Sequence, residues 1–195
     1  MMNAAMDNSV SPRVLVIGAS AGGVTALQKA LRALPAGLSI PVLVVLHLPR
    51  DRPSRIAELL DPDCALSVRE AEDKQPLQPG TVTFAPPDYH LLVEDRDSVA
   101  LSLDAPVLFS RPAVDPLFES AAAVFGEHVL AILLTGASSD GSDGVAAVRE
   151  VGGRAWVQCP DDAEASLMPA SALQRAGADA VLTLDQICEC LKELR

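Results

Sequence analysis

The sequence predicts an α/β fold, a three-layer doubly wound and mostly parallel sheet with an antiparallel hairpin at one edge. Three observations lead to this fold class. Short, wholly apolar runs alternate with longer amphipathic stretches, which is typical of parallel strands covered by helices on both faces. A central segment is rich in short β-type runs instead. The 195 residues, 49% of them hydrophobic and 21% charged, fit one globular domain.

The first part of the chain supplies the parallel strands. Residues 13–17 and 40–46 are apolar at nearly every position, as strands buried on both faces require. Residues 22–34 and 52–60 carry apolar side chains at helical spacing, and residues 65–68 predict a short third strand. We expect a tail at residues 1–12 and a single catalytic domain over residues 13–195.

The central segment predicts an antiparallel hairpin or meander at a sheet edge. Its three short runs, separated by turn residues, are 80–85, 90–94 and 99–103. The α/β alternation then resumes. Helices are expected at 114–125, 142–151, around Pro169 and from residue 185, and strands at 128–134, 154–157 and 180–182.

Composition excludes several classes of function. With 15 basic and 26 acidic residues, the chain carries a net charge of −11, which disfavours binding to nucleic acid or to an anionic membrane. Its apolar runs are far shorter than the ~20 residues of a membrane span, and its first ten residues do not read as a signal peptide. We therefore expect a cytoplasmic protein without membrane insertion.

The cysteines do not indicate a metal site. No pair has C-x-x-C spacing, and the chain has only three histidines, so we expect no metal and no cofactor. Reduced, partly buried thiols are expected at Cys64, Cys159, Cys188 and Cys190.

A glycine-rich turn follows the first strand. Residues 18–23 (GASAGG) lead directly into a helix. A dinucleotide-binding turn would need glycine where Ser20 stands, so that interpretation is disfavoured. The same letters form G-x-S-x-G, a strand-to-helix turn that presents a serine hydroxyl above the sheet. The alternative is that Ser20 only caps the helix.

Two further polar residues are expected at the same sheet edge. His47 follows the strand at 40–46, and Asp140 follows the strand at 128–134 in the run TGASSDG. Because parallel strands end at one edge, these residues and Ser20 should converge there. Histidine can take the proton of a serine hydroxyl, and a carboxylate can orient the imidazole. Their order along the chain, Ser…His…Asp, differs from that of α/β-hydrolases.

Other polar residues are weaker candidates. His90 lies within the predicted hairpin and His128 at the opposite sheet edge, so both are expected to be structural. Asp143 falls in the first turn of a helix, where acidic residues favour the helix dipole. Ser138 and Ser139 belong to the same loop as Asp140 and offer hydroxyl or amide donors.

The chain resembles the catalytic domain of chemotaxis protein-glutamate methylesterases, the CheB family, from about Val14 to the C-terminus. Six short motifs in order carry the resemblance: IGASAGG (17–23), LHLP (46–49), APPDYHLL (85–92), RPAVD (111–115), LTGASSDG (134–141) and Met168-Pro169.

The resemblance implies hydrolysis of methyl esters on glutamate side chains of chemoreceptor cytoplasmic domains, with release of methanol. It makes Ser20 the nucleophile, His47 the general base and acid, and Asp140 the orienting carboxylate. Backbone N–H groups near Ala21, His47 or Ala137 are candidates for the oxyanion hole. Other residues expected at or beside the substrate are Gly22, Arg111 and Met168.

The chain also departs from the family pattern. Ala21 replaces a common threonine, Ala137 a common methionine, and Ser139 a common asparagine. The family's regulatory receiver domain has no counterpart in the roughly twelve residues before the first strand, so a separate regulatory protein is a possible partner. Alternative functions are glutamine deamidation, cleavage of another protein ester, and non-catalytic docking on receptors.

Overall fold

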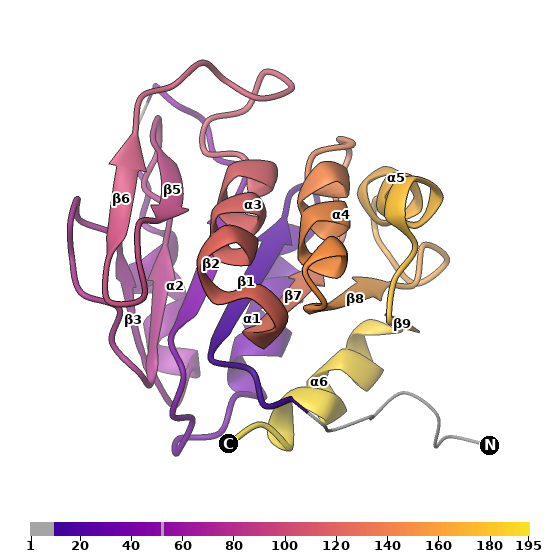
Figure 1. Ribbon diagram of the computed structural model, residues 1–195, viewed down its shortest axis with the longest axis horizontal. Coiled ribbons are helices and arrows are strands. Elements are labelled where there is room, and N and C mark those ends of the chain that lie inside the picture. The colour runs from indigo at the N-terminus through magenta and orange to yellow at the C-terminus, as the bar shows by residue number, and fades with distance from the viewer. Residues whose placement is uncertain (1–9, 52) are drawn as a thin grey trace.

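The computed structural model describes residues 10–51 and 53–195 and arranges them in three layers, with helices on both faces of a central sheet (Figure 1). The sheet has seven parallel strands in the order β3-β4-β2-β1-β7-β8-β9. Their bounds are β1 (Val14–Ala19), β2 (Val42–Leu46), β3 (Ser67–Glu70), β4 (Thr81–Phe84), β7 (Val129–Leu133), β8 (Arg154–Gln158) and β9 (Ala180–Leu182).

Alternate residues of each inner strand enter two different hydrophobic cores. In β1, Leu15 and Ile17 belong to one core, whereas Val14 and Val16 belong to the other. This explains why every position of the strand is apolar. The helices of the first face are α1 (Gly23–Arg32), α2 (Ile56–Leu60) and α6 (Leu184–Lys192); those of the second are α3 (Val114–Phe125), α4 (Ser142–Glu150) and α5 (Leu167–Ala176).

The central segment differs from its prediction in one respect. Residues 80–85 were expected in the antiparallel hairpin, but β4 lies in the parallel sheet between β3 and β2. Its Val82, Thr83 and Phe84 are all buried, as a strand covered on both faces requires. The hairpin itself consists of β5 (His90–Val93) and β6 (Val99–Ser102), which form a separate two-stranded antiparallel sheet.

That small sheet packs against α3 on the second face, and its other side is hydrogen-bonded to residues 73–77, which follow the edge strand β3. The backbone N–H of Val93 in β5 donates to the hydroxyl of Ser120 in α3 at 3.0 Å. The loop that returns from β6 to α3, residues 103–113, projects beyond the sheet (Figure 1).

Three further expectations concern the N-terminal tail, membrane-spanning helices and the cysteines. A tail is expected at residues 1–12, and its residues 1–9 lie outside the part of the chain that the structure describes. In the described ranges, no helix has both the length and the apolar character needed to cross a bilayer. The four cysteines are partly buried free thiols.

The strand order determines where the residues that follow β1, β2 and β7 come together. From β1 the chain first moves to β2 on one side, and it later returns to β7 on the other side. In the register of the sheet, Ala19 lies opposite Leu46, and Gly18 lies opposite Leu133. The residues that follow β1, β2 and β7 therefore emerge together, at the type of switch point where α/β proteins bind ligands.

Candidate active site

Ser20 occupies a tight turn between β1 and α1. Its N–H donates to the carbonyl of Thr135 at 2.9 Å, and its own carbonyl accepts from Gly23 at 2.7 Å. Gly22, which immediately precedes α1, has a φ of 75°, a left-handed conformation that favours glycine. At Gly18, a Cβ atom would lie 2.4 Å from Cγ1 of Val114, so the close approach of α3 also requires glycine. The Ser20 residue itself is partly exposed.

His47 follows β2 directly and lies beside the Ser20 turn. Its N–H donates to the carbonyl of Ala19 at 3.1 Å, which continues the parallel ladder by one step. Its ring Nε2 is 2.7 Å from Oδ2 of Asp140, and the His47 side chain is mostly buried. The strand ends therefore bring His47 and Asp140 into direct contact, as the sequence predicts.

Asp140 is fully buried at the N-terminus of α3. Its Oδ2 accepts from the N–H of Val114 at 2.6 Å, and its Oδ1 accepts from the N–H of Asp115 at 2.9 Å. Burial alone would raise the pKa of Asp140, but hydrogen bonds from His47 and from these two N–H groups outweigh it and hold the pKa below its ordinary value. The carboxylate is thus ionised, and it can accept a hydrogen bond from the imidazole.

The second ring nitrogen of His47 faces a different serine. Nδ1 lies 3.4 Å from the hydroxyl of Ser110, which belongs to the loop before α3. Within the described residues, no hydrogen bond joins the Ser20 hydroxyl to the ring, although the two residues are neighbours across β1 and β2. Ser110 has no signal in the sequence, because it lies 63 positions from His47 and belongs to no strand end.

A second buried carboxyl group, that of Asp115, lies behind Asp140. It is 7% exposed, and its Oδ1 accepts from the N–H of Gly144 in the first turn of α4 at 2.7 Å. Burial, above all, together with the nearby charge of Asp140, raises the pKa of Asp115 to about 7 despite the Gly144 bond. The sequence gives this residue only as part of the RPAVD motif.

Thr135 and Gln158 hold together the loops around Ser20. The Thr135 hydroxyl donates to the carbonyl of Ala21 at 2.9 Å and accepts from the N–H of Ala165 at 2.8 Å. Its backbone N–H donates to Oε1 of the buried Gln158 at 2.9 Å. In the sequence, Thr135 is only a member of the LTGASSDG motif, and Gln158 lies one residue beyond the strand expected at 154–157.

Of the residues expected at or beside the substrate, Arg111 and Met168 make hydrogen bonds that hold loops in place, and Ala137 is exposed. The guanidinium of Arg111 donates to Oδ1 of Asp88 at 2.8 Å and to the carbonyls of Leu103 and Asp104, so it fastens the base of the loop. Met168 is fully buried, and its N–H donates to the carbonyl of Gly136 at 2.9 Å. Ala137 is exposed on the loop that leads to Asp140.

The residues with structural interpretations make other contacts and, within the described residues, no hydrogen bond to His47 or Asp140. His90 is buried and bonds through Nδ1 to the N–H of Ala113 at 3.2 Å. His128 lies just before β7, at the opposite end of that strand. Asp143 in α4 pairs with Arg175 at 2.9 Å. Among the residues the structure describes, no three His, Cys, Asp or Glu side chains gather as a metal site would need.

Known proteins resemble this chain over most of its length. The family described as CheB methylesterase matches residues 15–191. A Leptospira interrogans protein, provisionally named a protein-glutamate methylesterase/protein-glutamine glutaminase, is 41% identical over 90% of this chain and 91% of its own length. A Methanosarcina acetivorans protein named protein-glutamate methylesterase/protein-glutamine glutaminase 2 is 35% identical over 96% of this chain but only 54% of its own length.

A solved structure gives the same fold. The crystal structure of the Thermotoga maritima CheB methylesterase catalytic domain has a TM-score of 0.88 to this chain and is 33% identical to it. The match covers 94% of this chain and 99% of the Thermotoga chain. The match to the family extends over nearly the whole sequence. The sheet carries the serine turn and the His47–Asp140 pair at the expected strand ends. The chain therefore belongs to the CheB methylesterase family.

Proposed function

We propose that the protein is a serine hydrolase that removes methyl esters from glutamate side chains of chemoreceptor cytoplasmic domains. Ser20 is the nucleophile, His47 the general base and acid, and Asp140 the orienting carboxylate. The observation that carries the proposal is the His47–Asp140 pair, 2.7 Å apart, beside the turn that presents Ser20. The names and family of the relatives support the same reaction.

The Asp140 contact determines which nitrogen of His47 acts as the base. An ionised carboxylate only accepts hydrogen bonds, so Nε2 must carry the proton that faces Asp140. Nδ1 then holds the free electron pair. In the proposed reaction, Nδ1 takes the Ser20 proton while Oγ attacks the ester carbonyl. The Ser20 hydroxyl reaches Nδ1 after it displaces the Ser110 hydroxyl from the ring.

The reaction then proceeds in two halves. Collapse of the tetrahedral intermediate breaks the bond to the methoxy group, which takes the proton from His47 and leaves as methanol. A water molecule gives a proton to His47 and attacks the acyl-enzyme. Breakdown of that second intermediate returns the proton to Ser20 and releases the glutamate carboxylate. Only the neutral imidazole can take the Ser20 proton, because a ring protonated on both nitrogens has no free electron pair.

The start of α1 offers donors for the developing oxyanion. Within the described residues, the N–H groups of Ala21 and Gly22 have no hydrogen-bond partner, and they precede the first turn of the helix. The N–H of the residue after the nucleophile is a common oxyanion donor in strand-to-helix serine turns. We assign this role to Ala21, with Ala137 on the facing loop as the second candidate. The N–H of His47 is already donated to Ala19.

The relatives' names include a second activity, glutamine deamidation. The same acyl-enzyme would form from a glutamine side chain with ammonia as the leaving group, and water would release the same glutamate. No residue described above discriminates between the two leaving groups. We therefore expect ammonia release from receptor glutamines to depend on the same residues as methanol release.

A single assay tests the proposal. Purified protein is incubated with receptor cytoplasmic fragments that carry radiolabelled methyl esters, and released methanol is measured for wild type and Ser20→Ala in parallel. Release by the wild type alone is the expected result. Equal release by both proteins would exclude Ser20 as the nucleophile, and no release by either would exclude this substrate for the isolated protein.

A further inference from the structure

We infer that the tip of the loop before α3, residues Leu108 and Phe109, is a recognition element that contacts the polypeptide around the scissile glutamyl ester. This inference rests on the proposed function, and it adds how the protein distinguishes a protein substrate from a free ester. The tip is defined here as Leu108 and Phe109, and the loop as residues 103–113.

Exposure is the first observation. Phe109 is 97% exposed and Leu108 is 50% exposed, so the largest apolar ring of the loop contributes almost nothing to either core. Large exposed apolar groups that gather at one place commonly mark interaction sites. Single exposed residues elsewhere, such as Val151 at the end of α4, carry no such meaning.

The backbone of the tip is the second observation. Val107 and Ser110 exchange both backbone hydrogen bonds, at 3.0 and 2.8 Å, which closes a two-residue turn. Leu108 and Phe109, the two central residues, have φ values of 47° and 67°. Turns of this kind strongly prefer Asn-Gly, because residues with a bulky side chain are strained at positive φ. The sequence therefore has apolar side chains at two positions whose backbone conformation disfavours them.

The third observation is continuity with the active site. The residue after the tip is Ser110, whose hydroxyl lies 3.4 Å from Nδ1 of His47. The base of the loop is fastened by Arg111, which donates to two loop carbonyls and to Asp88. A polypeptide whose ester reaches Ser20 and His47 must therefore pass close to the tip.

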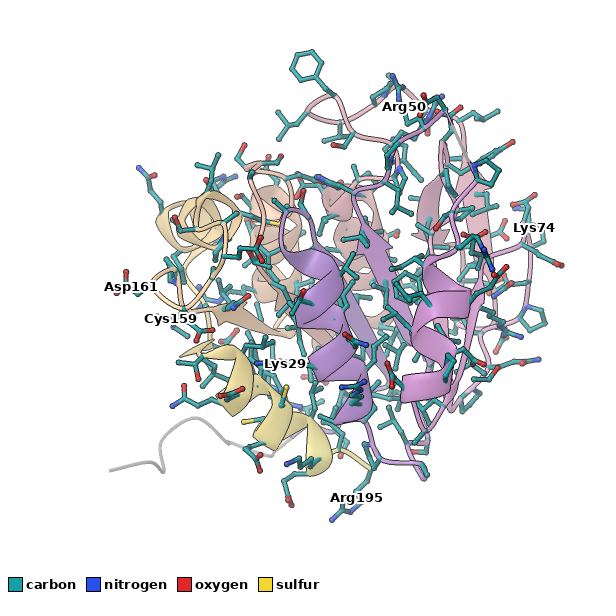
Figure 2. All side chains as sticks on the ribbon, turned by 180° about the vertical axis from the view of Figure 1, so that it is seen from behind. Lys29, Arg50, Lys74, Cys159, Asp161 and Arg195 are labelled. Carbon is teal, nitrogen blue, oxygen red and sulfur yellow. The ribbon has the colours of Figure 1, made fainter. Side chains whose placement is uncertain are left out.

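The surroundings of the tip indicate the chemistry of the polypeptide. Pro106, Leu108 and Phe109 line a surface hollow of about 450 Å³ together with Arg50. Figure 2 shows Arg50 at the end of the molecule where the loop projects. An apolar side chain of the substrate fits the three apolar groups. The half-exposed guanidinium of Arg50 lies 3.9 Å from Oδ1 of Asp88, a carboxylate that it shares with Arg111, and a substrate carboxylate fits its exposed side. The expected partner is thus the ester-bearing polypeptide itself, with an apolar and an acidic residue near the ester.

A paired-substrate experiment tests this inference. The double variant Leu108→Asn with Phe109→Gly supplies the residues that the turn prefers and removes both apolar side chains. For each protein, kcat/KM is measured on a methylated receptor fragment and on a small ester, N-acetylglutamate γ-methyl ester. We expect the ratio of the two values to fall by about tenfold in the double variant, mainly through KM on the fragment. Val151→Ala, an exposed apolar change at the far end of α4, should leave the ratio at its wild-type value.

The outcomes separate the inference from the function on which it rests. An unchanged ratio in the double variant overturns the inference, whether both rates stay the same or both fall together. If the double variant is more thermally stable than wild type and its ratio is unchanged, the tip is only a strained turn and has no role in recognition. Wild-type protein that cleaves neither ester overturns the proposed function, and this inference with it. If only the tip assignment fails, both wild-type reactions remain measurable.

Discussion

The imidazole of His47 meets the carboxylate of Asp140 through Nε2, at 2.7 Å, and its Nδ1 is left facing the hydroxyl of Ser110. Asp140 is itself held by two backbone N–H groups at the start of α3. Helix N-termini favour a negative charge, so the fold fixes both the ionisation of the carboxylate and the orientation of the ring. This relationship has direct consequences for the reaction.

Replacing Asp140 by asparagine should nearly abolish turnover without unfolding the protein. An amide nitrogen in place of Oδ2 loses the bond from the Val114 N–H but can donate its own N–H to Nε2, which would shift the ring proton to Nδ1 and remove the free electron pair from the serine side. We expect kcat to fall by about 10³- to 10⁴-fold. Methanol release under saturating receptor fragment measures this, with circular dichroism as the control for folding. A variant that retains a tenth of wild-type kcat would contradict the assigned tautomer.

The two serines near His47 should respond differently to truncation. Ser110→Ala removes a hydroxyl that contacts Nδ1 but leaves the Asp140 bond in place, so kcat should change by less than about tenfold. Ser20→Ala should lose essentially all turnover, since the attacking oxygen is gone. Steady-state rates of the two variants and of wild type on the methylated receptor fragment test this difference. If Ser110→Ala is the inactive variant and Ser20→Ala is active, the roles given to the two serines are reversed.

Asp115 should make the fold less stable as the pH rises. Its pKa is about 7 in the folded protein and near 3.8 in the unfolded chain, so the folded state retains a proton that the unfolded state has lost over this range. Its contribution to stability is therefore fully present below pH 3.8 and is lost as the pH rises through 7. The total loss is on the order of a few kcal/mol.

Asp115→Asn tests that dependence. Asparagine keeps an oxygen for the Gly144 N–H but has no charge to bury. Urea unfolding at pH 5 and pH 8 should show the variant gaining stability relative to wild type as the pH rises. Both proteins retain Asp140, whose lowered pKa acts in the opposite direction. Identical pH dependence in the two proteins would show that Asp115 is already ionised at neutral pH.

The approach of α3 to β1 should be sensitive to a single methyl group. Gly18→Ala would place a Cβ atom 2.4 Å from Val114, the residue whose N–H holds Asp140. We expect a loss of about 1–3 kcal/mol in the free energy of unfolding. Activity should fall as well. Gly37→Ala is the matched control, because a Cβ atom there has nothing within 4 Å. Equal stability of the two variants would contradict the tight packing of α3 on β1.

Much of the site follows from the sequence because of how parallel sheets are built. Apolar parallel strands that lead into Ser20, His47 and the loop that holds Asp140 bring those residues to one edge of the sheet. The structure brings His47 and Asp140 into contact and leaves the Ser20 turn beside them, as this reasoning expects. The prediction needs strand polarity above all, which the alternation of apolar strands and amphipathic helices along the chain implies.

The contacts made across long stretches of chain could not be predicted in the same way. Ser110 reaches His47, and Asp115 reaches Gly144, through loops and helix ends with no periodic signal. The strand at 81–84 was misassigned because its length and composition suit a hairpin as well as a buried parallel strand. Its neighbours β3 and β2 decide the outcome, and their pairing is a tertiary property.

The identity of the nucleophile is tested most directly by covalent labelling. A serine-directed phosphonate is added to the wild-type protein, and the adduct is mapped by mass spectrometry after proteolysis. We expect one adduct, on Ser20, whose formation rate falls sharply in the Asp140→Asn variant. An adduct on Ser110, or labelling of Ser20 that is indifferent to the Asp140 change, would contradict it.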